Sequence, residues 1–196
     1  MQLRMIRTNL LNLPEIKMPP GYRLRTYQEN DNWHWANIIN SSFGGDRTDA
    51  DTREQIVDRP EFESTSLFFS TYQDQPVGTA CAWKWNGADE KEVGQLHMVG
   101  VMPEHSGYRL GKWVSLAVLY YHRQQGFKCA VLGTDDFRLP AIKTYLNLDF
   151  MPIYVEDDQP ERWQVIFEKL KLPFISDSVD QVRTALSENI ITKIYQ

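Results

Sequence analysis

The stretch Val99 to Lys112, V-G-V-M-P-E-H-S-G-Y-R-L-G-K, determines how the rest of this chain is interpreted. An apolar run ends at Pro103, and a short polar loop that holds Gly107 and Gly111 follows. The apolar residues after it recur at the spacing of one helical face: Leu110, Trp113, Val114, Ala117, Val118 and Tyr121. The stretch therefore predicts a strand, a glycine-bearing loop and a helix.

The predicted junction has the properties of an anion-binding site. Backbone N–H groups in the first turn of a helix lack intrahelical partners, and the helix dipole adds positive charge there. Together they suit a phosphate group. Gly107 allows close approach of a ligand, and Gly111 allows either close approach or tight packing. Arg109 and Lys112 add cationic side chains. The loop alone leaves two interpretations open, a phosphate site or a plain strand–helix turn.

The same stretch resembles motif A of the GNAT superfamily, the acyl-CoA-dependent N-acyltransferases, which reads roughly V-x-P-x-x-[Q/R]-x-x-G-x-[G/A]. Val101, Pro103 and Gly111 match, whereas Ser106 stands at the Gln/Arg position and Arg109 at the central Gly. The resemblance implies acetyl-CoA as co-substrate. It assigns the acetyl carbonyl and pantetheine to Val99 and Val101, and the pyrophosphate to Ser106, Gly107, Tyr108, Arg109, Leu110, Gly111 and Lys112.

A second stretch, Arg138 to Phe150, resembles GNAT motif B, usually N-x-x-A-x-x-x-Y-x-x-x-G-F. Ala141, Tyr145 and Phe150 match, whereas Arg138 replaces the usual Asn and Asp149 the usual Gly. The resemblance implies that Tyr145 is the general acid that protonates the coenzyme A thiolate, with Ala141 beside the cofactor. Arg138 would meet a cofactor phosphate. A phenol with a pKa of about 10 stays protonated at neutral pH. A Tyr that only packs at a helix end remains the alternative.

A general base is expected on the strand before the loop. Gln95, His97, Val99 and Val101 share one face there, because side chains alternate along a strand with a period of two. Many family members carry a catalytic Glu at the position of Gln95, which cannot take a proton, and others carry a His at the position of His97. An imidazole can accept a proton from an ammonium. A hydrogen-bonded pocket histidine is the alternative, and some members use no protein base.

The remaining pattern gives the order of elements. Strands are predicted at 21–27, 66–72, 77–85, 93–101, 128–133, 150–155 and 163–169, and helices at 30–42, 48–58, 110–125 and 139–148. Turns are predicted at 73–76 and 86–89. This is the GNAT order. It implies an α/β (α+β) fold with a mixed, mostly antiparallel central sheet, splayed fourth and fifth strands, and helices on both faces. Gly100 fits a bulge in the fourth strand.

The predicted domain organisation has three parts: an extended leader at 1–20, a GNAT-like domain at 21–172, and a helical tail at 173–196. The tail carries an apolar stripe, with Asp177 or Ser178 as helix cap: Val179, Val182, Leu186 and Ile190. This stripe suits packing either on its own domain or on a second subunit in a homodimer.

Composition limits the class of protein. The net charge of −5 argues against nucleic acid as the main partner. Cys81 and Cys129 lie in apolar runs, so we expect buried free thiols in a reducing compartment and no metal site. No apolar run reaches the roughly 18 residues that span a bilayer, and no signal sequence is visible. These features predict a cytoplasmic protein that does not enter a membrane.

The sequence thus predicts an acetyl-CoA-dependent N-acetyltransferase that acts on a primary amine of an unknown small-molecule or peptide acceptor. The amine would attack the thioester directly in a ternary complex. A non-catalytic acyl-CoA-binding module with a regulatory or assembly role is the alternative. The departures from the family pattern support it: Gln95, Ser106, Arg109, Arg138 and Asp149. A cofactor-free scaffold protein is a third interpretation.

Overall fold

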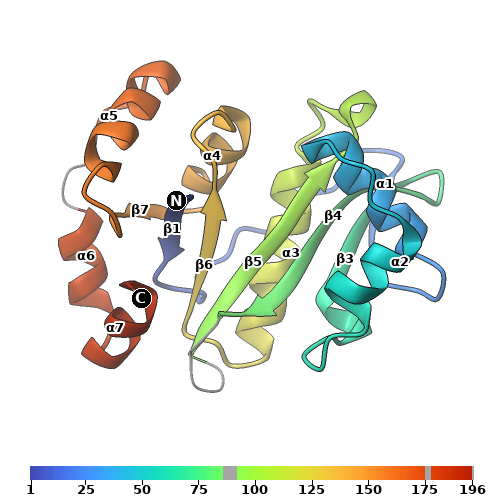
Figure 1. The fold of residues 1–196 in the computed structure, drawn as a ribbon, viewed down its shortest axis with the longest axis horizontal. Coiled ribbons are helices and arrows are strands. Elements are labelled where there is room, and N and C mark those ends of the chain that lie inside the picture. Colours follow the sequence, from blue (N-terminus) through green and yellow to red (C-terminus); the bar gives the residue numbers. More distant parts are fainter. Residues whose placement is uncertain (86–91, 175–177, 196) are drawn as a thin grey trace. The chain divides into compact units, whose positions relative to one another are not determined.

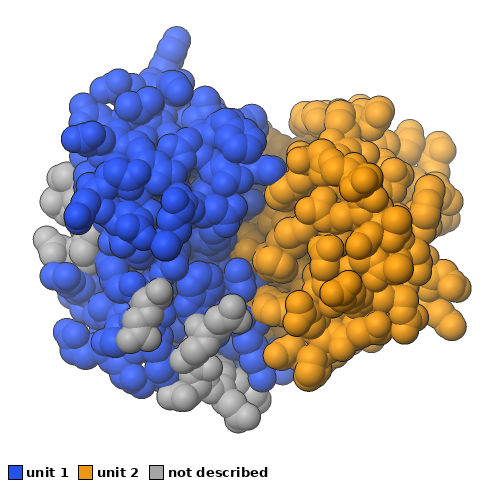
Figure 2. All heavy atoms as spheres, in the orientation of Figure 1, with its two compact units in different colours: residues 1–11, 84–95, 125–196 blue, residues 12–83, 96–124 orange. Residues whose placement is uncertain are grey.

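The computed structural model describes residues 1–85, 92–174 and 178–195, with the backbone alone in 178–181. The chain divides into two compact units (Figure 2). Unit 1 comprises residues 1–11, 84–95 and 125–196, and unit 2 comprises residues 12–83 and 96–124. The predicted turn at 86–89 and the helix cap at Asp177 lie outside the described residues.

One mixed sheet contains the strands in the order β2-β3-β4-β5-β6-β1-β7 (Figure 1). Strand β5 (Val93–Val101) begins in unit 1 and continues in unit 2. Its parallel pairing with β6 (Cys129–Thr134) joins Val93–Gln95 to Cys129–Val131. Strand β1 pairs antiparallel with β6 and β7, and β3 pairs antiparallel with β2 and β4. The mixed, mostly antiparallel sheet with helices is the predicted fold class, which is therefore confirmed.

Unit 2 holds the antiparallel part. Strands β2 (Tyr22–Thr26), β3 (Leu67–Tyr72) and β4 (Gln75–Lys84) pair in sequence order. The connection from β2 to β3 contains the helices α1 (Asn32–Phe43) and α2 (Asp49–Thr52), the π-helical turn Arg53–Val57 and the 3₁₀ turn Ser64–Ser66. Helix α3 (Leu110–Gln124) follows β5.

Local chemistry sets the helix ends in this connection. Gly44, with φ of 75°, ends α1, because glycine accepts that backbone conformation without a Cβ clash. The Thr48 side chain accepts from the Asp51 N–H, and the Asp51 carboxylate accepts from the Thr48 N–H, which forms a capping box for α2. The predicted stop and start of these helices are confirmed.

A core under α1 fixes this helix on the sheet. Its fully buried members come from α1, the π-helical turn, β3 and β4: Trp35, Ile38, Ile39, Ile56, Leu67, Phe69 and Cys81. Each large apolar side chain buried here stabilises the fold by roughly 1.5–3 kcal/mol. The neighbouring end of β5 is therefore held against a rigid layer.

Unit 1 has β1 (Leu3–Arg7) between β6 and β7 (Met151–Ile153), antiparallel to both. The predicted leader therefore supplies a strand of the sheet. Four helices complete the unit: α4 (Leu139–Leu146), α5 (Gln159–Leu170), α6 (Ser178–Ala185) and α7 (Glu188–Tyr195).

The strand predicted at 163–169 is wrong, because these residues lie in α5. Trp163, Ile166 and Phe167 are buried at i, i+3 and i+4, which is the spacing of a helix face. Pro160 stands in the first turn, where its missing N–H costs no hydrogen bond.

The C-terminal tail packs on its own unit. Val182, Ile190 and Ile194 are buried in one cluster with residues from β1, β5, β6 and β7: Ile6, Val93, Cys129, Val131 and Ile153. The Trp85 indole N–H also donates to the Lys193 carbonyl at 3.2 Å. Of the two arrangements left open by the sequence, packing on the same chain is the one found. Val182 and Ile190 of the predicted stripe are thus buried within this chain, and the homodimer stays a prediction.

Candidate functional site

Strand β5 changes direction at Met98. This residue has φ of 50°, in the left-handed region that non-glycine residues seldom adopt. Two hydrogen bonds show one extra residue in β5: Trp85 N–H donates to the Val93 carbonyl, and Met102 N–H to the Val77 carbonyl. Eight residue steps separate Val77 from Trp85, but nine separate Val93 from Met102. The strand therefore contains a β-bulge.

The bulge lies at Met98 and not at the predicted Gly100. Gly100 has another role, because a Cβ built on it would lie 3.0 Å from Ser42 Oγ and 3.2 Å from Ile39 Cδ1. Both partners belong to α1. The glycine at this position therefore allows α1 to pack closely on the strand.

The bulge also separates the residues that were predicted to share one face. The His97 ring lies 6.1 Å from the Trp83 ring, and Trp83 packs with Met98 on the α1 core. Val101, in contrast, points toward α3, where a Cβ built on Gly111 would lie 3.8 Å from its Cγ2. The shared face predicted for these residues is wrong, because a left-handed residue interrupts the alternation of side chains.

His97 has the protonation state of a base. Its side chain is half-buried, and burial lowers its pKa below the ordinary 6.5. Desolvation disfavours the charged imidazolium, so the ring is neutral at pH 7. His97 can therefore accept a proton from a substrate that reaches it.

The loop before α3 contains two left-handed residues. Gly107 has φ of 88° and Arg109 has φ of 58°, with Tyr108 between them. The position of Arg109 is the one at which motif A usually has glycine. The conformation explains that preference, since only glycine adopts it without strain. Arg109 keeps the same backbone shape at a cost of roughly 1–2 kcal/mol.

Consecutive amides of this loop are free. Within the described part of the chain, five backbone N–H groups make no hydrogen bond: Gly107, Tyr108, Arg109, Leu110 and Gly111. The next two N–H groups, of Lys112 and Trp113, both donate to the Arg109 carbonyl at 3.0 and 3.2 Å. Successive free N–H groups at the positive end of a helix dipole suit the binding of an anion.

The side chains around these amides leave the loop open. Ser106, Gly107, Tyr108 and Arg109 are all exposed. The ammonium of Lys112 lies 5.1 Å from the centre of the Trp113 ring. Arg109 belongs to this run of amides and Lys112 follows it directly in the sequence, so a cationic role for both stays a prediction.

Tyr145 in unit 1 is a buried acid. Its side chain is 7% exposed and packs on Phe150, with ring centres 6.1 Å apart. Burial raises the pKa of the phenol far above its ordinary value, an effect that the charge of Arg138 opposes. None of the hydrogen bonds found among the described residues involves this hydroxyl. It therefore stays protonated and able to donate throughout the physiological pH range.

Arg7 holds the turn that carries Tyr145. Leu148 N–H and Phe150 N–H both donate to the Tyr145 carbonyl, at 2.9 and 3.0 Å. The guanidinium of Arg7, 4% exposed, donates to the Leu148 carbonyl and to Asp149 Oδ2. Asp149 has φ of 56°, which again explains the glycine usual at this position of motif B. Sequence reasoning missed Arg7. An arginine closing the apolar run L-R-M-I-R was the available signal.

Arg138 and Ala141 stand at the start of α4. Arg138 Nε donates to Asp135 Oδ2 at 3.0 Å, and its guanidinium lies 5.2 Å from the centre of the Phe137 ring. Ala141 is half-buried one turn before Tyr145. Arg138 is thus already held by an aspartate, and a phosphate would have to compete with that ion pair.

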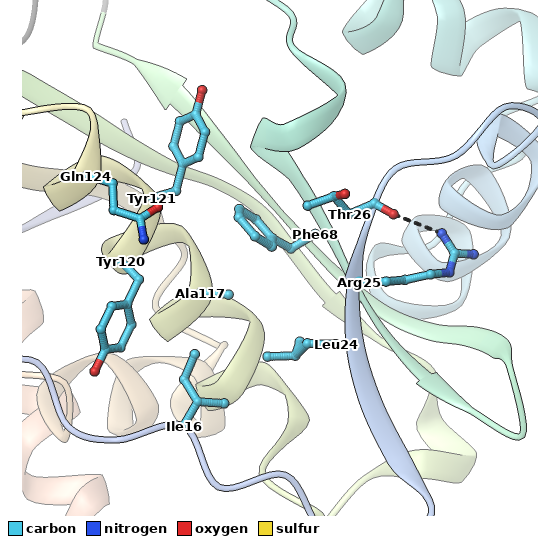
Figure 3. A pocket seen from close by; sticks show the side chains of 9 residues that line it. All are labelled: Ile16, Leu24, Arg25, Thr26, Phe68, Ala117, Tyr120, Tyr121 and Gln124. Carbon is cyan, nitrogen blue, oxygen red and sulfur yellow. Dashed lines mark hydrogen bonds between the residues drawn. The ribbon is translucent and has the colours of Figure 1, made fainter.

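A separate pocket of about 300 Å³ lies in unit 2, away from the loop (Figure 3). Apolar side chains from the leader, β2, β3 and α3 face one another across it: Ile16, Leu24, Phe68 and Ala117. Arg25 turns aside and donates to the Thr26 carbonyl at 3.1 Å. The free amides do not line this pocket, so it is distinct from the predicted pyrophosphate site.

The described residues lack the features of a metal site and of a membrane-spanning helix. The described residues hold no group of three or more His, Cys, Asp or Glu side chains that could bind a metal ion. None of the described helices has the length and apolar character needed to cross a bilayer. Cys81 and Cys129 are buried free thiols, as predicted.

Comparisons with known proteins agree with the two motifs. The sequence model of the acetyltransferase (GNAT) family matches residues 32–150. A mycothiol acetyltransferase from Thermomonospora curvata is 27% identical over 144 residues, which cover 70% of this chain and 47% of the relative. The chain spans about half the length of the curated relatives it matches.

Solved structures share the fold. A GCN5-related N-acetyltransferase from Sphaerobacter thermophilus has a TM-score of 0.64 at 16% identity, over 77% of this chain and 48% of the other. An aminoglycoside N-acetyltransferase in complex with CoA has a TM-score of 0.55 at 19% identity, over 66% of this chain and 88% of the other. At these identities the likeness shows the fold alone.

Proposed function

Because the chain belongs to the acetyltransferase (GNAT) family, we propose that it transfers the acetyl group of acetyl-CoA to a primary amine. The family predicted from the two motifs is confirmed. The observation that carries the proposal is the run of five free backbone N–H groups from Gly107 to Gly111. Loop amides at a helix start suit the diphosphate of a coenzyme A ester.

The donor would be held by the backbone more than by side chains. The amides of 107–111 bind the pyrophosphate, and Arg109 and Lys112 add two positive charges beside it. In this proposal Val99 and Val101 bond the pantetheine arm and the acetyl carbonyl, while Ser106 borders the pyrophosphate. Ala141 and Arg138 remain proposed contacts in unit 1, with Arg138 leaving Asp135 to meet a phosphate.

The reaction is direct attack within a ternary complex. The nitrogen lone pair of the neutral amine forms the new C–N bond at the thioester carbon, and the C–S bond then breaks. His97 takes the proton that the amine loses, and Tyr145 gives a proton to the departing thiolate. Burial supports both assignments, because it lowers the pKa of His97 and raises that of Tyr145, which keeps His97 neutral and Tyr145 protonated at pH 7.

The acceptor is proposed as the amine of a small molecule or a peptide. The curated relatives are named mycothiol acetyltransferases, so their acceptor is the first to test. Asp157, Asp158 and Glu161 precede or open α5 and offer negative charge to a cationic amine.

One observation supports a second function, a non-catalytic acyl-CoA-binding module. Gln95 occupies the position of the family's catalytic glutamate and cannot accept a proton. Such a module would bind acetyl-CoA without releasing coenzyme A.

Release of free coenzyme A thiol, measured across a panel of amines, tests the proposal. We expect turnover with at least one amine and a fall of kcat by about 10²-fold in Tyr145→Phe, within the range for general acid catalysis. Leu146→Met, one residue away on α4, is the matched control and should leave kcat unchanged. Binding of acetyl-CoA without turnover across the panel would instead support the binding module.

A further inference from the structure

An aromatic shelf lies beside the free amides in unit 2. It consists of Tyr22 on β2, Tyr72 at the end of β3, and His105 and Tyr108 from the loop. The Tyr22 ring centre lies 4.9 Å from that of Tyr72, 5.0 Å from that of Tyr108 and 5.7 Å from that of His105. The four rings therefore form one continuous cluster.

One ring of the shelf is buried, and two others are exposed to solvent. Tyr22 is 7% exposed, and its hydroxyl is 2.9 Å from His105 Nδ1. Tyr72 is 37% exposed and Tyr108 is 50% exposed. A partly buried hydrogen bond thus holds Tyr22 and His105 together, while two large rings stay accessible to solvent.

Backbone geometry ties the shelf to the amide site. Tyr108 lies between the left-handed residues Gly107 and Arg109, and its own N–H is one of the five free amides. Its ring and its amide belong to the same residue. A planar group one sugar away from a diphosphate on these amides is therefore within reach of the ring. Arg109 and Lys112 keep the surroundings positively charged.

We propose that Tyr108, which packs on Tyr22 as Tyr72 and His105 also do, stacks the adenine ring of acetyl-CoA. The inference rests on the proposed function, since it assigns the nucleotide end of the same donor. Adenine is a flat heteroaromatic ring, and aromatic side chains bind such rings by offset stacking. The shelf would select donors that carry the nucleotide over acetylated arms that lack it.

Two acetyl donors separate this role from a structural one. Acetyl-CoA carries the adenine nucleotide, whereas acetyl-4′-phosphopantetheine has the same reactive arm without it. Tyr108→Leu removes the ring and keeps apolar bulk. Tyr120→Leu is the matched control, because Tyr120 is a partly exposed tyrosine of α3 outside the shelf and the amide loop.

We expect Tyr108→Leu to raise KM for acetyl-CoA about tenfold, at the lower end of base stacking, with kcat unchanged. KM for acetyl-4′-phosphopantetheine should stay the same. Tyr108→Trp should restore the acetyl-CoA value, and Tyr120→Leu should change neither donor. An equal rise for both donors would overturn the shelf, because it would mean only that the loop had been disturbed.

Calorimetry of coenzyme A binding separates this proposal from the proposed function. If Tyr108→Leu weakens coenzyme A binding about tenfold and no amine is acetylated, the adenine-stacking proposal stands and the transferase proposal is refuted. If Tyr108→Leu changes neither turnover nor coenzyme A binding, the transferase proposal stands and the adenine-stacking proposal is refuted. Absence of coenzyme A binding to the wild-type chain would refute both proposals.

Discussion

Arg7 offers a quantitative test of how the turn after α4 is held. The guanidinium donates to the buried Leu148 carbonyl, to the exposed Asn9 carbonyl at 2.8 Å, and to Asp149. Arg7→Met keeps the apolar length of the side chain but leaves the Leu148 carbonyl without this partner. A buried polar group left unpaired costs about 1–3 kcal/mol.

Loss of the ion pair with the Asp149 carboxylate adds little to the expected loss of stability. Its side chain is 77% exposed, so water replaces the lost ion pair, which is worth about 0–1 kcal/mol. Arg7→Met should therefore lower the free energy of unfolding by about 2 kcal/mol. For a chain of this length that corresponds to a fall in Tm of about 4–8 °C.

Asp149→Asn is the matched comparison. Asparagine tolerates the left-handed conformation of residue 149 and removes only the exposed ion pair. We expect less than about 1 kcal/mol of destabilisation. Because the Leu148 and Phe150 amides bond the Tyr145 carbonyl, Arg7→Met should also lower kcat more than it changes KM for acetyl-CoA.

Differential scanning calorimetry and denaturant titration of both variants measure these costs. Equal destabilisation by the two substitutions would refute the reasoning, since it would place the energy in the ion pair and not in the buried carbonyl. A Tm for Arg7→Met within a degree of the wild type would refute it as well.

The remaining predictions concern the loop and the base. Gly107→Ala places a Cβ at φ of 88°, so we expect it to weaken coenzyme A binding about tenfold, a loss of about 1.4 kcal/mol measured by calorimetry. Gly126→Ala, at φ of 85° and equally uncrowded, carries the same backbone strain beyond the end of α3 and should lower Tm without changing that affinity. Loss of affinity in both would contradict a local role for Gly107. For His97, a pKa lowered by burial means that the neutral, active form is lost only as pH falls below the ordinary 6.5. The rate should therefore drop on the acidic side of that value, and His97→Gln should lack this limb in a pH–rate profile. The pKa of Tyr145 is raised, so the rate should show no loss from this residue between pH 7 and about 10.

The sequence was most informative where local pattern determines structure. The helical periodicity from Leu110 and the glycines at 107 and 111 predicted the strand–loop–helix unit that carries the free amides. These features depend on neighbours within a few residues, so a single sequence contains them. The turn chemistry around Gly44 and Thr48 was predictable for the same reason.

Structure that depends on distant partners was not predictable. Strand β1 is short, and its place is set by pairing with β6 and β7, more than a hundred residues away. The aromatic shelf brings together residues from β2, β3 and the loop, which no periodicity links. Met98 gives no sign of its left-handed backbone, because nothing in a methionine favours that conformation.

Helix α5 was misread for a different reason. A seven-residue window from Trp163 alternates enough to suggest a strand, but Pro160 and the spacing of Trp163, Ile166 and Leu170 indicate a helix over a longer window. The error came from window length and not from a competing tertiary effect.

The departures from the family motifs are of two kinds. Arg109 and Asp149 replace glycines, yet both keep the left-handed backbone that explains the glycine, with φ of 58° and 56°. The surroundings hold them there: the Arg109 carbonyl accepts from two amides of α3, and Arg7 bonds Asp149. These two substitutions change the residue type and preserve the backbone conformation. Gln95 differs, because no backbone geometry substitutes for a missing carboxylate. Whether the chain is catalytic therefore depends on which group accepts the proton that the attacking amine loses. His97 is the described side chain of β5 that can accept it, because burial keeps its imidazole neutral.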